Sequence, residues 1–236
     1  GGGRWPGSKQ KTPTPTFFAT STLTVGDADI DGVSLTLRNG VRLSGRLEFS
    51  GTSDKPAGRQ QFYLHVERRD GTAAWQLDTT AAIGKDEKFE TAELPSGFYF
   101  FRASEVVGPW RLESITANGD DISDVPFEIS DKPIGSIVAR FTDKPSQLSG
   151  VVRPAGGERP DGALAAVFPA DSARWKDYGE SPRGIRQLTI AKDGTFSTTG
   201  LPAGNYLVAA VHDDFITNWR DPAFLAKLAS FATRVS

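Results

Sequence analysis

The chain of 236 residues contains no cysteine and no methionine, and it has only two histidines. Without cysteine it can form no disulfide, no thiolate metal site and no cysteine nucleophile. His65 and His212 do not stand in a cluster that could supply the ligands of a zinc site. No G-x-S-x-G elbow and no glycine-rich loop between a strand and a helix is present. The sequence therefore predicts no catalytic site and no cofactor, and hence a protein that is not an enzyme.

Long apolar runs and a strong excess of one charge are missing too. No run approaches the roughly 18 apolar residues of a membrane-spanning helix, so no span is predicted. The net charge of −2 provides no electrostatic footprint for nucleic acid. A translated product begins with methionine, whereas this chain begins with Gly1-Gly2-Gly3, so we expect a processed or excised piece of something longer.

Glycine and proline, by contrast, are plentiful, with 25 and 15 residues. This composition is typical of short strands joined by many turns rather than of a helical protein. Residues 1–16 are mostly Gly, Pro, Lys and Thr, and Pro13 and Pro15 lack the donors that a sheet ladder needs. We expect this segment to be an extended arm or linker.

One stretch of sequence occurs twice. Residues 193–211 match residues 86–103 without a gap, and the Phe, Thr, Leu, Pro, Gly and the aromatic residue after the Gly coincide. In the second copy Pro202 fixes its own φ, and we expect Gly204 to adopt a positive φ in a tight turn before a strand that starts at Tyr206. A repeat of this kind indicates two copies of one domain.

Apolar and polar residues alternate with period two through much of the chain, as in residues 33–37, 41–49 and 135–141. Strands of this length, separated by turn residues, predict antiparallel β-sandwiches. Asp221-Pro222 has the form of an N-cap followed by the first helical residue, and it predicts a short amphipathic helix over about 222–232. The last residues, 233–236, resemble the start of a strand.

The sequence therefore predicts an all-β protein of tandem Ig-like or transthyretin-like antiparallel β-sandwiches with one short C-terminal helix. Residues 17–40 are assigned to strands of a preceding or partner sandwich. The first complete sandwich is predicted over residues 41–143 and the second over residues 144–236.

The repeated pattern D-G-x-F-x-x-x-x-L-P-x-G-x-Y-x-V-x-A, preceded by L-S-G-x-V, resembles the carboxypeptidase regulatory-like domain. The matching residues of the second copy are Leu148, Ser149, Gly150, Val152, Asp193, Gly194, Phe196, Leu201, Pro202, Gly204, Tyr206, Val208 and Ala210. Those of the first copy are Leu43, Ser44, Gly45, Leu47, Asp86, Phe89, Leu94, Pro95, Gly97 and Ala103. The first copy departs from the pattern at Glu87, where the turn glycine would stand, and at Phe98.

The tandem arrangement is similar to that of large bacterial exported proteins. The resemblance implies a seven-stranded transthyretin-like sandwich and an extracellular, cell-surface or periplasmic location. Because these domains are mostly non-catalytic accessories, it implies little about a specific activity.

An acidic segment raises the question of a metal site. Asp27, Asp29 and Asp31 fit the first half of a calcium loop, D-x-D-x-D-G, but Arg38 stands where the bidentate glutamate should be. We interpret the segment as an acidic turn in which Ile30 is a buried anchor, as Ile122 would be in the later copy. A calcium site at the three aspartates is the alternative.

Several aromatic residues lie in polar, loop-like surroundings and are candidates for contacts with a partner or ligand. These candidates are Trp5, Phe17, Phe18, Trp175, Tyr178 and Trp219. Exposed aromatic rings can stack on sugar rings or anchor a protein partner. The alternative is packing within the protein, which we favour for Trp75 and Trp110.

Two functions remain open at this point. The first is a structural or assembly module of an extracellular or cell-surface protein, whose residues 1–38 contact another subunit and build a filament by strand or arm exchange. Its partners are then further copies of itself or neighbouring domains of the same protein. The alternative is a carbohydrate-binding accessory module that uses the loop aromatics to bind a polysaccharide.

Overall fold

The computed structural model describes residues 17–21, 23–56, 63–71, 79–103, 108–130, 134, 136–153, 156, 162–212 and 219–236. Strands that pair mostly antiparallel are the main secondary structure of these residues, and a single α-helix accompanies them in the described ranges, which confirms the predicted all-β class. No helix in those ranges is long and apolar enough to cross a membrane.

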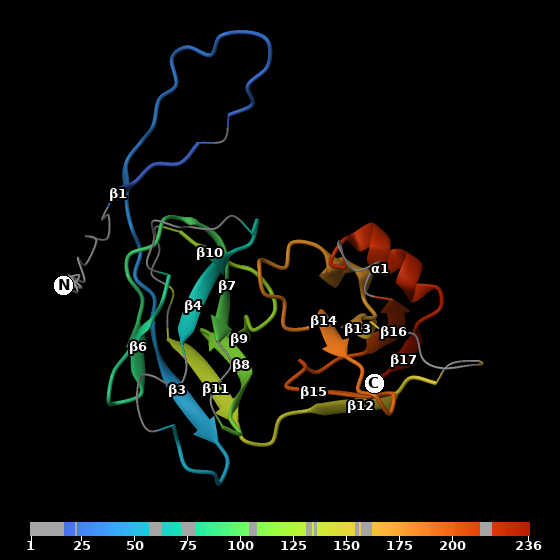
Figure 1. The fold of residues 1–236 in the computed structure, drawn as a ribbon. Helices are drawn as coiled ribbons and strands as arrows, with labels where there is room; N and C mark the ends of the chain where they lie inside the picture. The colour runs from blue at the N-terminus through green and yellow to red at the C-terminus, as the bar shows by residue number, and fades with distance from the viewer. Residues whose placement is uncertain are drawn as a thin grey trace, which may run out of the picture.

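The first unit consists of two facing sheets (Figure 1). The larger has the order β5 (Ala82–Ile83), β6 (Lys88–Glu90), β3 (Ser44–Ser50), β11 (Ile137–Thr142), β8 (Arg111–Ala117) and β9 (Asp120–Asp121). The smaller has the order β10 (Phe127–Ile129), β7 (Gly97–Ala103) and β4 (Leu64–Arg68). All neighbouring strands are antiparallel except β3 and β11, which run parallel.

One apolar core fills the space between these two sheets. β11 contributes Ile137, Ala139 and Phe141, each with no exposed surface, because alternate residues of a strand point to the same face. The smaller sheet contributes Tyr99 and Phe101 from its central strand β7. Both sheets are therefore bound into one sandwich by burial of large side chains.

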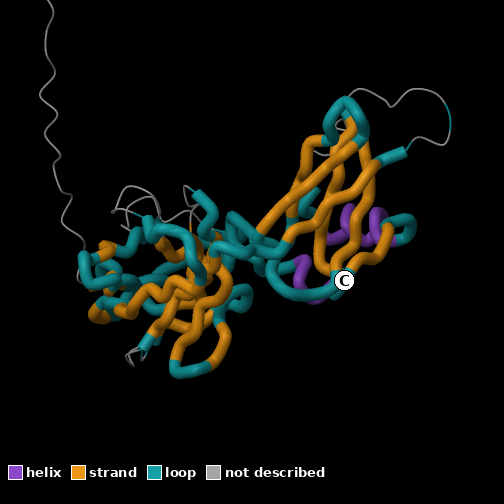
Figure 2. The backbone as a smooth tube through the Cα atoms, turned by 90° about the horizontal axis from the view of Figure 1, so that it is seen from below, coloured by secondary structure: helices purple, strands orange, loops and turns teal. Residues whose placement is uncertain are grey.

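The second unit has a smaller pair of sheets and the helix (Figure 2). One sheet contains only β12 (Gln147–Val151) and β15 (Thr195–Thr199). The other has the order β14 (Arg186–Thr189), β13 (Ala163–Pro169), β16 (Tyr206–His212) and β17 (Thr233–Val235). A short 3-10 helix, η1 (Ser172–Trp175), follows β13, and α1 (Pro222–Ala229) precedes β17. The division of the chain at residues 143 and 144 stays a prediction. The unit before it is called the first sandwich and the unit after it the second.

The helix α1 begins where the sequence predicts and ends a little earlier. The Asp221 carboxylate accepts a hydrogen bond from the amide of Ala223, and Pro222 is the first helical residue. After Ala229 the amide and hydroxyl of Ser230 turn back to the carbonyl of Lys227 and close the last turn. Leu225 and Leu228 of α1 are buried against the four-stranded sheet.

The repeated sequence has the same geometry in both sandwiches. Gly97 and Gly204 have φ of 153° and 154°, so the predicted positive φ is confirmed. In each copy the tyrosine two residues later donates its hydroxyl back to the carbonyl of the proline. These bonds join Tyr99 to Pro95 at 3.0 Å and Tyr206 to Pro202 at 2.7 Å. The Leu-Pro-x-Gly-x-Tyr motif thus encodes a turn that is closed by a buried phenol.

Residues 17–21 and 23–39, which together are called the arm from here on, differ from the strands predicted for them. Only β1 (Phe17–Phe18) and β2 (Arg38–Asn39) form a ladder, and the residues described between them make a loop that projects from the first sandwich (Figure 1). The predicted strand over residues 33–37 has no strand neighbour in the described structure, so it forms no ladder. Ile30 is 43% exposed and is not the buried anchor we expected, whereas Ile122 is buried.

Replacing Gly204 by Val should lower the free energy of unfolding by about 1–3 kcal/mol, because a β-branched residue is strained at this φ. Urea denaturation of both proteins measures the change. Gly156→Val is a suitable control, since a side chain added there meets no atom within 4 Å. Equal effects of the two substitutions would contradict this account of the turn.

Candidate functional site

The residues that the structure describes offer no cluster of three His, Asp or Glu side chains that could hold a metal ion. Asp27, Asp29 and Asp31 lie in the projecting loop and are exposed. The Nε2 of His65 lies 3.3 Å from Oε1 of the Glu67 carboxylate. The two features that stand out instead are a buried polar junction between the sandwiches and the exposed arm.

Glu67 lies at the centre of the junction. It projects from β4 of the first sandwich, and its side chain is 7% exposed. Its Oε2 accepts hydrogen bonds from the amides of Glu180 and Ser181 in the second sandwich, at 3.2 Å and 3.1 Å. The hydroxyl of Ser181 donates to the other carboxylate oxygen. One carboxylate of the first sandwich therefore satisfies three donors of the second.

The surroundings of Glu67 keep it ionised. Burial by itself would raise its pKa, but hydrogen bonds from His65 and Ser181 and the positive charge of Arg102 outweigh that effect and lower the pKa to about 2. The carboxylate is thus charged at neutral and mildly acidic pH.

Arg102 of β7 is the buried cation that accompanies Glu67. Its Nε lies 3.4 Å from Oε2 of Glu67, and it donates to the carbonyl of Tyr178 in the second sandwich at 3.0 Å. Its guanidinium also lies over the ring of Phe100, 4.3 Å from the centroid. Burial lowers the pKa of Arg102, and the negative charges of Glu67 and Asp124 oppose this shift. The ion pair thus connects two strands of one sandwich and reaches the other.

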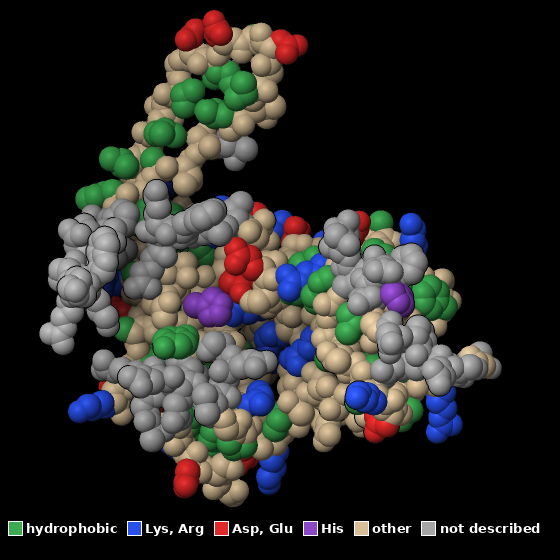
Figure 3. Space-filling view, in the orientation of Figure 1, with side chains coloured by type: hydrophobic (Ala, Val, Ile, Leu, Met, Phe, Trp, Pro, Cys, Tyr) green, Lys and Arg blue, Asp and Glu red, His purple; other side chains and the backbone are tan. Residues whose placement is uncertain are grey.

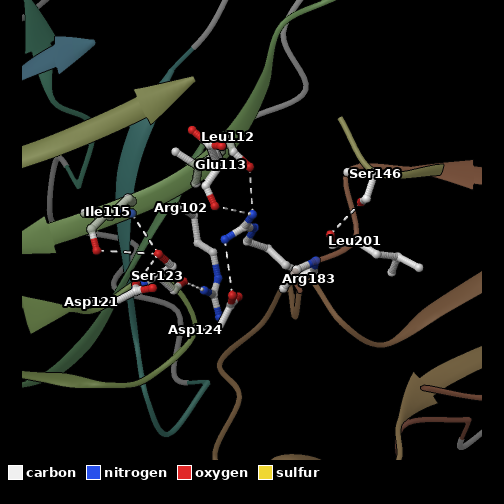
Figure 4. A network of polar contacts seen from close by, with 12 residues as sticks. Arg102, Leu112, Glu113, Ile115, Asp121, Ser123, Asp124, Ser146, Arg183 and Leu201 are labelled. Atoms are coloured by element: carbon white, nitrogen blue, oxygen red, sulfur yellow. Dashed lines mark hydrogen bonds and ion pairs between the residues drawn. The ribbon is translucent and has the colours of Figure 1, made fainter. Parts of the chain in front are cut away.

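Arg183 makes the reverse connection (Figure 4). It extends from the second sandwich, and its guanidinium lies 3.2 Å from the Asp124 carboxylate and donates to the carbonyl of Leu112 at 2.7 Å, both in the first sandwich. Figure 4 shows Arg102 and Arg183 next to Asp124, approaching it from different sandwiches. Each sandwich therefore inserts an arginine among acceptors of the other, and the contacts are directional on both sides.

A hollow of about 270 Å³ lies beside these contacts, between the two sandwiches. Its lining includes several basic residues, and Lys and Arg side chains are visible along this boundary in Figure 3. The basic lining residues are Arg69, Arg102, Arg174, Lys176 and Arg183. Arg69 is paired with Asp177, Arg102 with Glu67 and Arg183 with Asp124, so three of these charges have a carboxylate partner.

The predicted aromatic contacts have mostly internal partners. Trp175 is only 7% exposed, and its indole donates to the carbonyl of Pro169 at 2.7 Å, so it is not a surface contact residue as proposed. Tyr178 donates its hydroxyl to the carbonyl of Arg220 at 2.8 Å. Trp219 packs beside α1 with the Arg220 guanidinium over its ring. These rings hold the loops of the second sandwich together.

The remaining candidates differ in exposure. Phe17 is 58% exposed and Phe18 is partly buried, both in β1 at the base of the arm. Trp110 is 1% exposed and belongs to the first core, as we favoured for it. Trp5 and Trp75 lie outside the described residues.

The sequence interpretation missed the junction entirely. No sequence pattern predicted a role for Glu67, Arg102 or Arg183, although one signal was present. Arg102 directly follows four consecutive aromatic residues, 98–101, of a strand, and a charge at the end of such a run must find a buried partner or a water-filled surface. No comparable signal marks Arg183, which lies in a polar loop.

Comparisons with known proteins give no family. No family model matches the chain, and no curated protein matches it. Solved structures that are similar include the Bacillus anthracis TIE protein, with 13% identity and a TM-score of 0.26, and a streptococcal ancillary pilin, with 17% identity and a TM-score of 0.29. The shaft pilin SpaA from Lactobacillus rhamnosus GG has 11% identity and a TM-score of 0.26.

These matches cover 76%, 85% and 73% of this chain, and 32%, 63% and 88% of the other chains. The chain thus spans about a third of the first structure and less than two thirds of the second. TM-scores this low carry no argument about function, and the resemblance to the carboxypeptidase regulatory-like family stays a prediction.

Acid should weaken the junction. The folded-state pKa of Glu67 is depressed from 4.5 to about 2, so its stabilising effect is complete above about pH 4.5 and is lost as the pH falls through about 2. The full effect is on the order of 3 kcal/mol, at about 1.4 kcal/mol for each pKa unit. Urea denaturation at a series of pH values between about 6 and 2 measures it.

The variant Glu67→Gln should lack this part of the pH dependence, because the amide does not titrate. Glu128→Gln, which removes an exposed carboxylate on β10, should keep it. The same pH profile in wild type and Glu67→Gln would show that the carboxylate does not hold the junction.

Proposed function

We propose that the protein is a non-catalytic structural module of an extracellular or cell-surface protein, and that it assembles with further copies through its N-terminal arm. The exposed apolar residues of the arm carry this proposal. The buried junction adds to it, since it makes the two sandwiches a single stiff unit.

The arm exposes apolar side chains to an unusual extent. Val25 is 80% exposed, Leu35 is 57% exposed and Leu37 is 67% exposed, while Leu23 and Val33 are about half exposed. Contiguous apolar surface on a projecting segment favours association with a partner. The arm is also extended and alternates apolar with polar residues, which suits addition to a sheet edge of another molecule.

The junction supports a role as a spacer. Burying Glu67, Arg102, Asp124 and Arg183 costs desolvation, and only well-placed partners offset this cost. Removing one partner leaves an unpaired buried charge, so the sandwiches cannot change their relative orientation without losing several contacts together. A module that positions other domains or transmits force needs this property.

A carbohydrate-binding role has less support. Trp175 is buried and Tyr178 is partly buried against the core around α1, so neither ring presents a fully exposed face to a sugar. Proposed partners are therefore copies of the same chain or neighbouring domains, and the proposed location outside the cytoplasm rests on the sequence resemblance.

Removing residues 1–37 should abolish self-association and leave a folded monomer, because both sandwich cores lie outside the arm. Size-exclusion chromatography with light scattering over a range of concentrations measures the mass of both proteins. Circular dichroism checks that the shortened chain keeps its strands. If the shortened protein associates as the full chain does, the arm is not the contact.

A further inference from the structure

The second sandwich has a free sheet edge where the first sandwich has a strand. In the first sandwich β3 lies between β6 and β11. Its counterpart β12 pairs with β15 alone, and no other strand lies beside it in the described ranges. The unpaired edge of β12 therefore presents backbone donors and acceptors to which a strand can bind.

The pairing registers show that β12 and β3 are counterparts. Gly45 faces Phe89 across β3 and β6, and Gly150 faces Phe196 across β12 and β15. Both glycines belong to the repeated Leu-Ser-Gly sequence, and both phenylalanines to the repeated turn and strand. The position of β11 in the first sandwich can thus be transferred to the second.

The core of the second sandwich is incomplete on this side. The buried cluster between the two sheets consists of Val167, Leu201 and Tyr206, with Leu148 and Val208 partly buried around it. The buried Ala165 lies on the same face of β13 as Val167 but adds little volume. In the first sandwich β11 covers the corresponding region with three fully buried side chains. A strand added beside β12 would bury apolar side chains against the second core in the same way.

The glycine of β12 leaves room for that strand. A side chain on Gly45 would collide with the carbonyl oxygen of Ile137 in β11 and with the ring of Phe89. At Gly150 the three nearest atoms all belong to the ring of Phe196. The ring contact is therefore present in both sandwiches, whereas the close backbone of a neighbouring strand is found only in the first.

A segment of the arm has the pattern of the missing strand. Residues 33–37 precede the first sandwich as β11 precedes the second. Both segments place apolar residues at every second position. These are Val33, Leu35 and Leu37 in the arm and Ile137, Ala139 and Phe141 in β11. In β11 they are fully buried, whereas in the arm they are 47%, 57% and 67% exposed.

We propose that residues 33–37 of one copy add to the free edge of β12 in a second copy, parallel to it, as β11 adds to β3. The proposal rests on arm exchange as the proposed function and names its receiving surface. The donor is a second copy because the arm projects from the first sandwich far from β12 (Figure 1). Each addition uses the donor segment of one copy and the β12 edge of the other. One unused donor segment and one unused β12 edge therefore remain for further copies.

The register of the added strand follows from the first sandwich. Ile137 faces Gly45, and Val138 faces Arg46. In the second sandwich Val33 then faces Gly150, and Ser34 faces Val151. Val33 and Leu35 point to the incomplete core, while Ser34 lies on the solvent side next to Val151, which is 52% exposed in the monomer.

Cross-linking between copies tests this register. The chain has no cysteine, so Ser34→Cys and Val151→Cys can be made separately, mixed and oxidised without background from native thiols. We expect a disulfide-linked heterodimer as the main product, identified by mass spectrometry of the linked peptides. Leu35→Cys mixed with Val151→Cys is the matched control, because these two residues point to opposite faces of the sheet. Equal yields from the two mixtures would overturn the proposal.

A second variant separates this proposal from arm exchange in general. Leu35→Asp should weaken self-association by roughly tenfold or more, because a carboxylate would enter the second core. Leu23→Asp, elsewhere in the arm, should leave association nearly unchanged. If removal of residues 1–37 abolishes association but Leu35→Asp does not weaken it, the arm binds another surface and this proposal fails alone. If removal of the arm has no effect, both proposals fail.

Discussion

The burial of the Glu67 carboxylate between the two sandwiches is the constraint on which the rest of the structure depends. A carboxylate with 7% of its side chain exposed is tolerated only when its acceptor oxygens are filled, and here the amides of the second sandwich fill them. Arg102 and Arg183 then have fixed positions, because each needs an acceptor that the other sandwich supplies. The two sandwiches are thus joined by directional polar contacts and not by a linker alone.

Much of the fold could be predicted from local patterns. Alternation located the strands of the first sandwich, the Asp221-Pro222 pair located the helix, and the repeated turn predicted the positive φ of Gly204. These predictions are confirmed because each depends on residues that are close in the sequence. The exact end of the helix depends on the turn at Ser230, which no local pattern marks.

The junction could not be predicted in the same way. Glu67 and Ser181 are 114 residues apart, and only the relative placement of two folded units brings them together. The burial of Trp175 and the exposure of the arm have a similar cause. Trp175 is in a polar loop but turns inward to bond Pro169, and residues 33–37 have strand character without a strand neighbour in the described structure.

The proposed addition of residues 33–37 to β12 of a second copy, with the junction holding the two sandwiches together, should build unbranched filaments. Electron microscopy of the full chain at high concentration is the most direct test of this account. It predicts straight filaments with one constant axial repeat, because the junction holds both sandwiches of every copy in the same orientation. Particles that remain single at all concentrations, or flexible chains with no constant repeat, would contradict it.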